Sequence, residues 1–89
     1  MEPDLAEAYY IRGTVYGAKS EYEKAVADFD QAVLLKPDYA EAYYGRAIAY
    51  SSQKEYDKAA KDIKKSQALG FPVNPEMVEL LLKVTGGKE

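Results

Sequence analysis

The side chains that most often carry out chemistry in proteins are scarce in this sequence. The 89-residue chain contains no histidine and no cysteine. Histidine is the commonest general base and a favoured ligand of zinc, copper and iron, and cysteine would supply a thiol nucleophile or a disulfide. The sequence also has no phosphate-cradling glycine loop, no cluster of metal ligands and no nucleophile–base pair. We therefore expect no catalytic residue, no metal site and no cofactor, and we interpret the chain as not being an enzyme.

Two arginines and two aspartates occur at matched places and could form ion pairs or bind a ligand. Arg12 is followed by Asp28, and Arg46 is followed by Asp62 at the same spacing. A planar guanidinium can hold a carboxylate through two hydrogen bonds, so a structural ion pair is the favoured interpretation over ligand binding. If exposed, such a pair contributes no more than about 1 kcal/mol.

Lysines form the other candidate cluster, which could bind an acidic partner or a phosphate. Lys54, Lys58, Lys61 and Lys65 share one helical stripe, but acidic residues are interleaved with them, which favours a solvated face.

The net charge of −3 comprises −5 in residues 1–45 and +2 in residues 46–89. This balance argues against nucleic-acid binding. No apolar run is long enough to cross a membrane, so we expect a soluble protein, with the cytoplasm the best-fitting compartment.

The elements that must position these residues come from an internal repeat. The segment DLAEAYYIRGTVYGAKSEYEKA (4–25) returns as DYAEAYYGRAIAYSSQKEYDKA (38–59). The alignment pairs Tyr9 with Tyr43 and Tyr16 with Tyr50. It also pairs Arg12 with Arg46 and Asp28 with Asp62, and the two residues of every pair are 34 positions apart. A fixed period of this size indicates a repeat architecture.

Helix signals divide the chain into five helices. We expect helices over about 5–18, from about 21 to before Pro37, over the two matching segments of the second copy, and over about 75–84. Asp4, Ser20 and Asp38 each precede a glutamate by three residues, which is the spacing of a capping box. Gly70 predicts a helix C-terminus and Asn74-Pro75 predicts a helix start. On the last helix, Met77, Leu80, Leu81 and Val84 are expected to face inward, leaving Val78 and Leu82 for a neighbouring molecule.

These boundaries predict one all-α domain spanning residues 1–89. It comprises a first repeat at 6–39, a second repeat at 40–73, a closing helix at 74–85 and a frayed tail at 86–89. Because Met1-Glu2-Pro3-Asp4 looks like the end of an inter-repeat turn, we expect the chain to be cut from a longer array. Two repeats are fewer than the three or so usually needed for stability, so the exposed ends of the helix row are expected to lower the stability or solubility of the chain.

The repeated residues resemble the tetratricopeptide repeat pattern. The first copy carries Tyr9-x2-Arg12-Gly13-x2-Tyr16, then Ala25-x3-Phe29 and Pro37, and the second copy matches except that Gly70-Phe71-Pro72 replaces the terminal proline turn. Tyrosine stands for the family's tryptophan, and arginine for its usual leucine. The resemblance covers residues 3–72 and implies a right-handed α-solenoid of antiparallel helix pairs, without catalytic activity. The first helix of each pair would line a concave groove that holds a partner peptide.

Eight of the nine tyrosines fall into two groups. Tyr9, Tyr16, Tyr22, Tyr43, Tyr50 and Tyr56 keep helical spacing and are assigned to packing between helices. Tyr10 and Tyr44 each follow a packing position and are expected to face the groove. The candidate binding surface comprises Glu7, Tyr10, Thr14, Glu41, Tyr44, Ile48 and Ser51. The alternative is that these are ordinary exposed residues, which need no functional explanation.

Two functions follow from the resemblance. The first is a protein–protein interaction module that takes a peptide or helix in its groove. The second is an architectural segment that stacks or self-associates head to tail, because its acidic leading half and basic trailing half would attract one another. The lysine and asparagine clamp by which some members of the family bind the acidic tails of heat-shock chaperones is absent, since these helix faces carry Tyr10, Thr14, Tyr44, Gly45 and Ile48.

The adjacent tyrosines of the second copy allow packing and binding to be separated. Neighbouring residues lie about 100° apart around a helix, so Tyr43 and Tyr44 cannot share a face. The expected result is that Tyr43→Ala costs ~3–5 kcal/mol, as for a buried aromatic, whereas Tyr44→Ala leaves stability almost unchanged and weakens partner binding.

Overall fold

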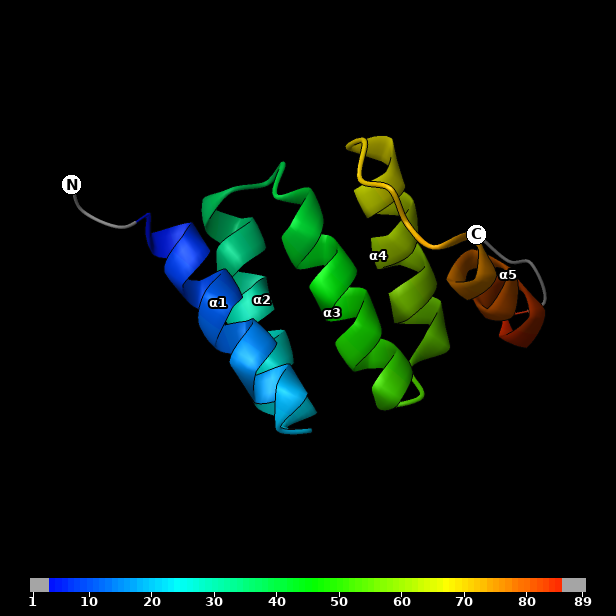
Figure 1. Ribbon diagram of the computed structural model, residues 1–89, viewed down its shortest axis with the longest axis horizontal. Coiled ribbons are helices and arrows are strands. Elements are labelled where there is room, and N and C mark those ends of the chain that lie inside the picture. The colour runs from blue at the N-terminus through cyan, green and yellow to red at the C-terminus, as the bar shows by residue number, and fades with distance from the viewer. Residues whose placement is uncertain (1–3, 86–89) are drawn as a thin grey trace.

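The computed structural model describes residues 4–85, which fold into five α-helices with no β-strand in that range. The first antiparallel pair is α1 (Leu5–Ala18) and α2 (Tyr22–Leu35), and the second is α3 (Ala40–Ser52) and α4 (Tyr56–Ala68). Helix α5 (Pro75–Val84) packs against α4 and follows the second pair in an extended row (Figure 1). None of the described helices combines the length and apolarity needed to cross a bilayer. Residues 86–89, where a frayed tail is expected, and residues 1–3 lie outside the described range.

Helices α1 and α5 begin with the side-chain caps that the sequence predicts. The Asp4 carboxylate accepts a hydrogen bond from the Ala6 N–H at 2.9 Å, and the Asn74 side chain accepts one from the Glu76 N–H at the same distance. Pro75 occupies the first turn of α5, where its missing N–H leaves no bond unmade. These contacts satisfy backbone donors that have no partner within the helix.

The two other predicted capping boxes are wrong. Helix α2 starts after Glu21 and α3 starts after Tyr39, and neither residue makes a side-chain capping hydrogen bond. Ser20 instead belongs to the end of α1, with φ of +63° and its N–H bonded to the Gly17 carbonyl. The turn between α1 and α2 is so short that the backbone of Ser20 is already used to terminate the first helix.

Three helices end in the same left-handed turn. Ser20, Lys54 and Gly70 all have positive φ, and the residue after each donates its N–H to a carbonyl five residues back, as in Glu21 to Tyr16 at 2.9 Å. This is the Schellman arrangement, which satisfies the last carbonyls of a helix. Gly70 adopts the conformation without a Cβ penalty, whereas Ser20 and Lys54 adopt it with one.

The core consists of two apolar clusters, one within and between the first three helices and one around α4. The first cluster is built on Ala6, Ala25, Phe29, Ala32, Tyr39, Ala42 and Ala49, and the second on Ala47, Ala59, Ile63 and Leu81. Five of the six tyrosines assigned to packing lie against these clusters: Tyr9, Tyr16, Tyr22, Tyr50 and Tyr56. Small residues at the buried centre therefore let helices approach while tyrosine rings close the sides.

Tyr43 differs from the buried packing residue that its spacing predicts. Its ring is half-buried and lies near the Arg46 guanidinium, at 5.5 Å, and the Lys65 ammonium, at 5.9 Å. Its hydroxyl donates to the Pro37 carbonyl at 2.9 Å. The expected cost of ~3–5 kcal/mol for Tyr43→Ala therefore assumes more burial than the side chain has.

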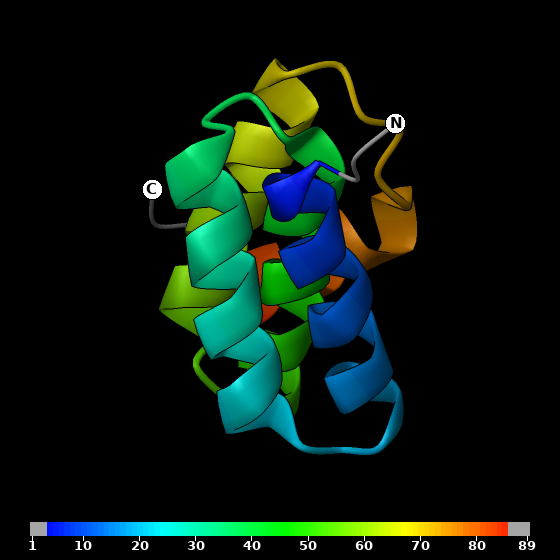
Figure 2. The same ribbon diagram turned by 90° about the vertical axis from the view of Figure 1, so that its left-hand side faces the viewer.

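Phe29 joins the two helix pairs. Its side chain is 3% exposed and lies between two glycines, one on α1 and one on α3. A Cβ added to Gly13 would lie 3.0 Å from the ring, and one added to Gly45 would lie 2.8 Å from it. Because these positions have no side chain, α2 can pack closely against both α1 and α3, as Figures 1 and 2 show.

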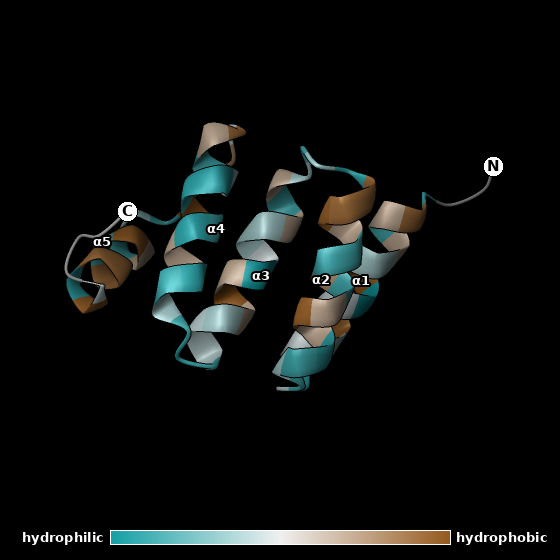
Figure 3. Cartoon of the chain, turned by 180° about the vertical axis from the view of Figure 1, so that it is seen from behind, coloured by the Kyte–Doolittle hydropathy of each residue, from teal (hydrophilic) through white to brown (hydrophobic). Residues whose placement is uncertain are grey.

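The core-facing side of helix α5 agrees only in part with the sequence prediction, since Met77 and Leu81 face the core as expected but Leu80 and Val84 do not. Met77, Val78 and Leu81 pack against the second core cluster, whereas Leu80 is 60% exposed and Val84 48% exposed. Val78 is partly buried and lines a small cavity between α4 and α5 together with Leu82, which is 43% exposed. Of the two residues expected to meet a neighbouring molecule, Leu82 is therefore the more accessible. Because α5 is apolar on most sides (Figure 3), its sequence alone does not determine which apolar stripe faces α4.

Candidate functional site

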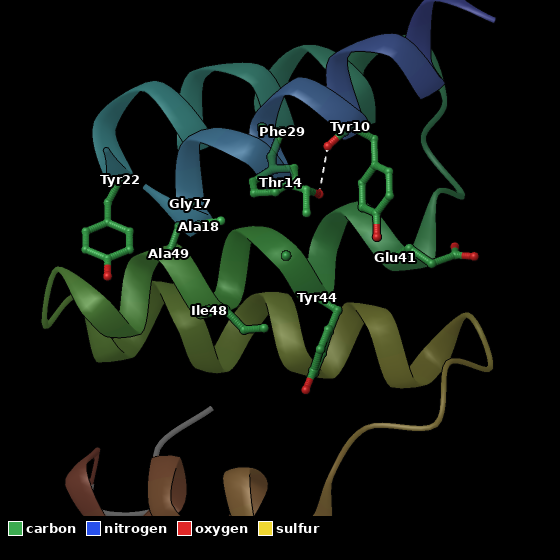
Figure 4. Close-up of a pocket in the computed structure, with 12 residues that line it drawn as sticks. Tyr10, Thr14, Gly17, Ala18, Tyr22, Phe29, Glu41, Tyr44, Ile48 and Ala49 are labelled. Atoms are coloured by element: carbon green, nitrogen blue, oxygen red, sulfur yellow. Dashed lines mark hydrogen bonds between the residues drawn. The ribbon is translucent and has the colours of Figure 1, made fainter. Parts of the chain in front are cut away.

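An open apolar hollow lies between α1 and α3, with α2 at its base (Figure 4). It has a volume of about 370 Å³, within the range of small-molecule and side-chain binding sites. Its lining residues are Tyr10, Gly13, Thr14, Gly17, Ala18, Tyr22, Phe29, Glu41, Tyr44, Gly45, Ile48 and Ala49. We call this hollow the groove.

The structure brings five of the seven candidate residues together in this groove. Tyr10 and Thr14 come from α1, and Glu41, Tyr44 and Ile48 come from α3. The other two do not line it. Glu7 is exposed in the first turn of α1, and Ser51 lies near the end of α3 with its hydroxyl oxygen buried and without a hydrogen-bond partner in the described part of the chain.

The two groove tyrosines are also packing residues. The Tyr10 ring contacts Phe29 and Tyr39, with centroid distances of 5.9 and 5.1 Å. The Tyr44 ring contacts Phe71 at 5.0 Å and packs against the second core cluster. The loop after α4 folds back and covers one side of the ring, so Tyr44→Ala removes packing as well as groove surface and should cost more stability than its sequence position suggests.

The sequence pattern missed the base of the groove. Gly13, Gly17 and Gly45 leave space above Phe29 that any larger side chain would narrow. Tyr22 and Ala18 contribute the end of the groove opposite Glu41 and Tyr10 (Figure 4). The sequence does contain a sign of this base. Glycine is unfavourable inside a helix, so three glycines in α1 and α3 indicate that another part of the protein packs closely against the backbone there.

The groove offers few polar groups. The Thr14 hydroxyl donates to the Tyr10 carbonyl at 2.9 Å, within its own helix. The Tyr22 hydroxyl donates to the Ser20 hydroxyl at 3.4 Å, and hydrogen bonding with Ser20 and Ser52 lowers the pKa of Tyr22. Glu41 is the single ionised residue among those that line the groove. Within residues 4–85 no three His, Cys, Asp or Glu side chains are grouped in a way that could hold a metal ion. The groove is therefore mainly apolar, with one carboxylate among its lining residues.

The predicted ion pairs are confirmed outside the groove, on the packed sides of the helix pairs. Arg12 donates to both oxygens of Asp28 at 2.8 Å, and Arg46 donates to both oxygens of Asp62 at 2.8 Å. The hydrogen bonds to these aspartates raise the pKa of both arginines. Each pair clamps the two helices of one hairpin through a bidentate contact.

Arg46 makes one contact that Arg12 lacks. Its Nη1 donates to Asp30 on α2 at 2.8 Å, so this arginine links the two helix pairs as well as the two helices of its own pair. Its side chain is only 17% exposed, whereas that of Arg12 is 60% exposed. The sequence predicted the pair within each copy but not this connection between copies.

The lysine stripe is solvated, as expected, and part of it contributes to packing. Lys58 lies 5.6 Å from the centre of the Tyr50 ring, as Lys24 lies 5.5 Å from that of Tyr16 in the first copy. Lys54 is not part of α4, because it occupies the left-handed turn before that helix. These cations add attraction for tyrosine faces.

Comparisons with known proteins agree with the repeat geometry. A family model described as TPR repeat matches residues 13–54, and a second one described as tetratricopeptide repeat matches residues 40–69. A search of the curated proteins found no match. The two models together cover residues 13–69, which run from the middle of α1 to the end of α4. The two helix pairs form an all-α solenoid of the kind that mediates protein–protein interactions without catalysis. The chain belongs to the tetratricopeptide repeat family.

Proposed function

We propose that the protein holds a partner peptide or helix in the groove between α1 and α3. The observation that carries the proposal is the pairing of wall residues at repeat-related positions. Tyr10 and Thr14 on α1 correspond to Tyr44 and Ile48 on α3, so the two walls present similar apolar surfaces to whatever lies between them. We also propose that the chain acts as one domain, with repeats at 6–39 and 40–73 closed by α5, and that it is not an enzyme.

The chemistry of the groove favours one kind of occupant. Its walls are aromatic and aliphatic, and its base is the Phe29 ring between glycines. Glu41 lies at one end beside Tyr10 (Figure 4). A peptide with an apolar anchor side chain and a lysine or arginine near it would bury apolar area in the groove and place its cation beside Glu41. Nucleic acid is a poor candidate occupant, because its phosphates would face this carboxylate.

Ile48 is the residue through which the proposal is best tested. It is 43% exposed, so a polar substitution there disturbs packing less than one at Tyr10 or Tyr44. A displayed library of short peptides would be selected on the unchanged protein and then measured against Ile48→Asp. We expect a loss of affinity of about tenfold or more, because a second carboxylate would be placed against the apolar anchor.

The matched control is Leu34→Asp, which places the same charge at a leucine that is 70% exposed on α2 and does not line the groove. Selected peptides should bind this variant as they bind the unchanged protein. Peptides that tolerate Ile48→Asp, or a selection that returns no binder, would contradict the proposal.

A second candidate function is head-to-tail self-association. It is favoured by exposed apolar residues on both end helices, namely Leu5 and Ile11 on α1 and Leu80 and Val84 on α5. The opposite charges of the two halves would add a contribution that salt screens. Sedimentation at rising protein concentration separates the two candidates, since salt-sensitive association would favour this one and a monomer at millimolar concentration in low salt would exclude it.

A further inference from the structure

Each groove tyrosine contacts a second aromatic ring that does not itself line the groove. The centre of the Tyr10 ring lies 5.1 Å from that of Tyr39, with 39° between the ring planes. The centre of the Tyr44 ring lies 5.0 Å from that of Phe71, with 40° between the planes. Neither Tyr39 nor Phe71 is among the residues that line the groove. The α1 wall and the α3 wall are therefore supported by the same ring geometry.

The two supporting rings are not equivalent in the repeat. A shift of 34 residues maps Tyr39 onto Val73, which packs against the second core cluster and lies two positions after Phe71. The supporting ring of the second copy comes instead from Gly70-Phe71-Pro72, the turn in which that copy departs from the first. The arrangement around Tyr44 is therefore a feature of this turn and is not inherited from the repeated sequence.

The turn holds the backbone of Phe71 on both sides. Gly70 before it has φ of +93°, and the N–H of Phe71 itself donates to the Ser66 carbonyl at 3.1 Å. Pro72 after it restricts Phe71 to extended conformations, because the proline ring clashes with a helical residue before it. The half-buried Phe71 side chain thus extends from a fixed backbone, so the loop presents its ring in one place.

Tyr44 depends on its supporting ring more than Tyr10 does. The Tyr10 ring also contacts Phe29 at the base of the groove, at 5.9 Å. Tyr44, on the α3 wall in Figure 4, packs against the second core cluster, and Phe71 is its one aromatic partner within residues 4–85. Its hydroxyl makes no hydrogen bond in that range. Because a tyrosine side chain has several staggered rotamers, the ring would sample more than one of them without Phe71.

We propose that Phe71 is a positioning residue for the groove, which orients the Tyr44 ring on the α3 wall before a partner binds. The inference rests on the proposed function, since it concerns how the same groove holds an apolar side chain. A wall ring that is already oriented need not be ordered when the partner arrives, and ordering one such side chain weakens binding by about two- to tenfold. The affinity of the groove therefore depends on a residue outside it.

Two substitutions separate the ring of Phe71 from its apolar bulk. Phe71→Tyr keeps the ring, whereas Phe71→Leu keeps an apolar side chain without one. In the isotope-labelled full chain, Phe71→Tyr should leave the χ1 couplings of Tyr44 unchanged, and Phe71→Leu should give couplings averaged over several rotamers. This measurement needs no partner. An unchanged set of Tyr44 couplings in Phe71→Leu would overturn the proposal.

Peptides selected on the unchanged protein provide the binding measurement. We expect Phe71→Leu to weaken their binding by about two- to tenfold, and Phe71→Tyr to leave it within about twofold. The matched control is Val73→Ala, which removes packing of the same loop against the second core cluster and changes neither ring pair. This control should lower the melting temperature and leave the affinity unchanged. Equal weakening by Val73→Ala and Phe71→Leu would mean that the loop acts only through stability, contrary to the proposal.

A double-mutant cycle tests whether Phe71 acts through Tyr44. Protein carrying Tyr44→Leu has no ring to orient, so adding Phe71→Leu should cause no further loss of affinity. The same loss with and without Tyr44→Leu would refute the positioning role. A library that returns no binder would contradict the proposed function and with it the binding role of Phe71. Unchanged Tyr44 couplings beside normal peptide binding would contradict the positioning role alone.

Discussion

At the scale of single residues, the two arginines have the same local partners and different surroundings. Both make a bidentate contact with a buried aspartate, but only Arg46 is enclosed by helices on two sides and bonded to Asp30 as well. A buried carboxylate that loses its cation retains its desolvation cost without compensation. The consequence of removing each arginine should therefore differ although the sequences around them are alike.

We expect Arg46→Met to lower the free energy of unfolding by ~3 kcal/mol, because Asp62 is 5% exposed and Asp30 would lose its partner in the same step. Arg12→Met should cost less, since Arg12 is 60% exposed and holds one carboxylate, whereas Arg46 is 17% exposed and holds two. Urea unfolding of both variants measures the difference. Arg46→Met combined with Asp62→Leu should recover much of the loss, because an apolar pair has no unpaired charge. An equal cost for the two arginines would contradict this account.

At the scale of the helices, Ser20 and Lys54 adopt a left-handed backbone conformation that is unfavourable for residues with a Cβ. Only the third such turn, at Gly70, has the residue that adopts positive φ without strain. Ser20 and Lys54 occupy equivalent positions in the two copies. The hydrogen bonds of the turn and the short connection it allows outweigh the local penalty.

Lys54→Gly should stabilise the protein by ~1 kcal/mol, because glycine removes the Cβ penalty of the left-handed conformation at φ of +65°. The matched control is Lys58→Gly, the same replacement inside α4, which should destabilise by about 1 kcal/mol through lost helix propensity. Thermal melts of the two variants should thus move in opposite directions. A shift of both in the same direction would mean that the turn is not strained.

At the scale of the whole molecule, stability depends on how the two helix pairs are joined. The joint comprises Phe29 over Gly45, the Arg46–Asp30 contact, and Tyr39 against Tyr10. The hydroxyl of Ser66 on α4 adds a hydrogen bond to the Ala40 carbonyl at 3.0 Å inside the second pair. Because each repeat packs only against its neighbour, changes at this joint should affect cooperativity as well as stability.

Gly45→Ala should lower the free energy of unfolding by about 1–2 kcal/mol, because the added methyl would overlap Phe29 and force the helices apart. Gly17→Ala is the control, since its Cβ would meet only Ala25 at an ordinary 4.0 Å and the change improves helix propensity. Urea unfolding of the first variant should also broaden if the two pairs unfold separately. Stabilisation by Gly45→Ala would refute the close packing of α2 on α3.

Tyr39 makes the joint sensitive to alkaline conditions. Burial raises the pKa of Tyr39 from 10.0 to about 12, with added contributions from nearby acids. A pKa that is higher in the folded than in the unfolded protein means that stability is fully present below about pH 10 and is lost as the pH rises towards about 12. The free energy of unfolding lost over this pH range is on the order of 2 kcal/mol. Tyr39→Phe should remove this part of the loss, so its advantage over the unchanged protein should grow between about pH 9 and pH 12 in denaturant titrations.

The sequence by itself determined the local features of this protein. The 34-residue period, the helix bounds near Leu5–Ala18 and Pro75–Val84, the caps at Asp4 and Asn74, and the pairs of Arg12 and Arg46 depend on residue type and spacing within one repeat. The arginine and aspartate of each pair have the same spacing in both copies, so each copy supported the interpretation of the other. Five of the seven candidate residues chosen through the family resemblance lie together in the groove, and their binding of a partner stays a proposal.

Only the tertiary structure decided the features that depend on neighbours. Tyr44 is covered by Phe71 from a distant loop, α5 turns Val78 inward and Leu80 outward, and Arg46 meets Asp30 whereas Arg12 meets no such group in the described chain. Helical periodicity fixes which residues share a face, but not which neighbouring element covers that face. The same repeated sequence therefore forms a closed interface on α3 and an open one on α1, because only α3 has a helix pair before it in the described structure.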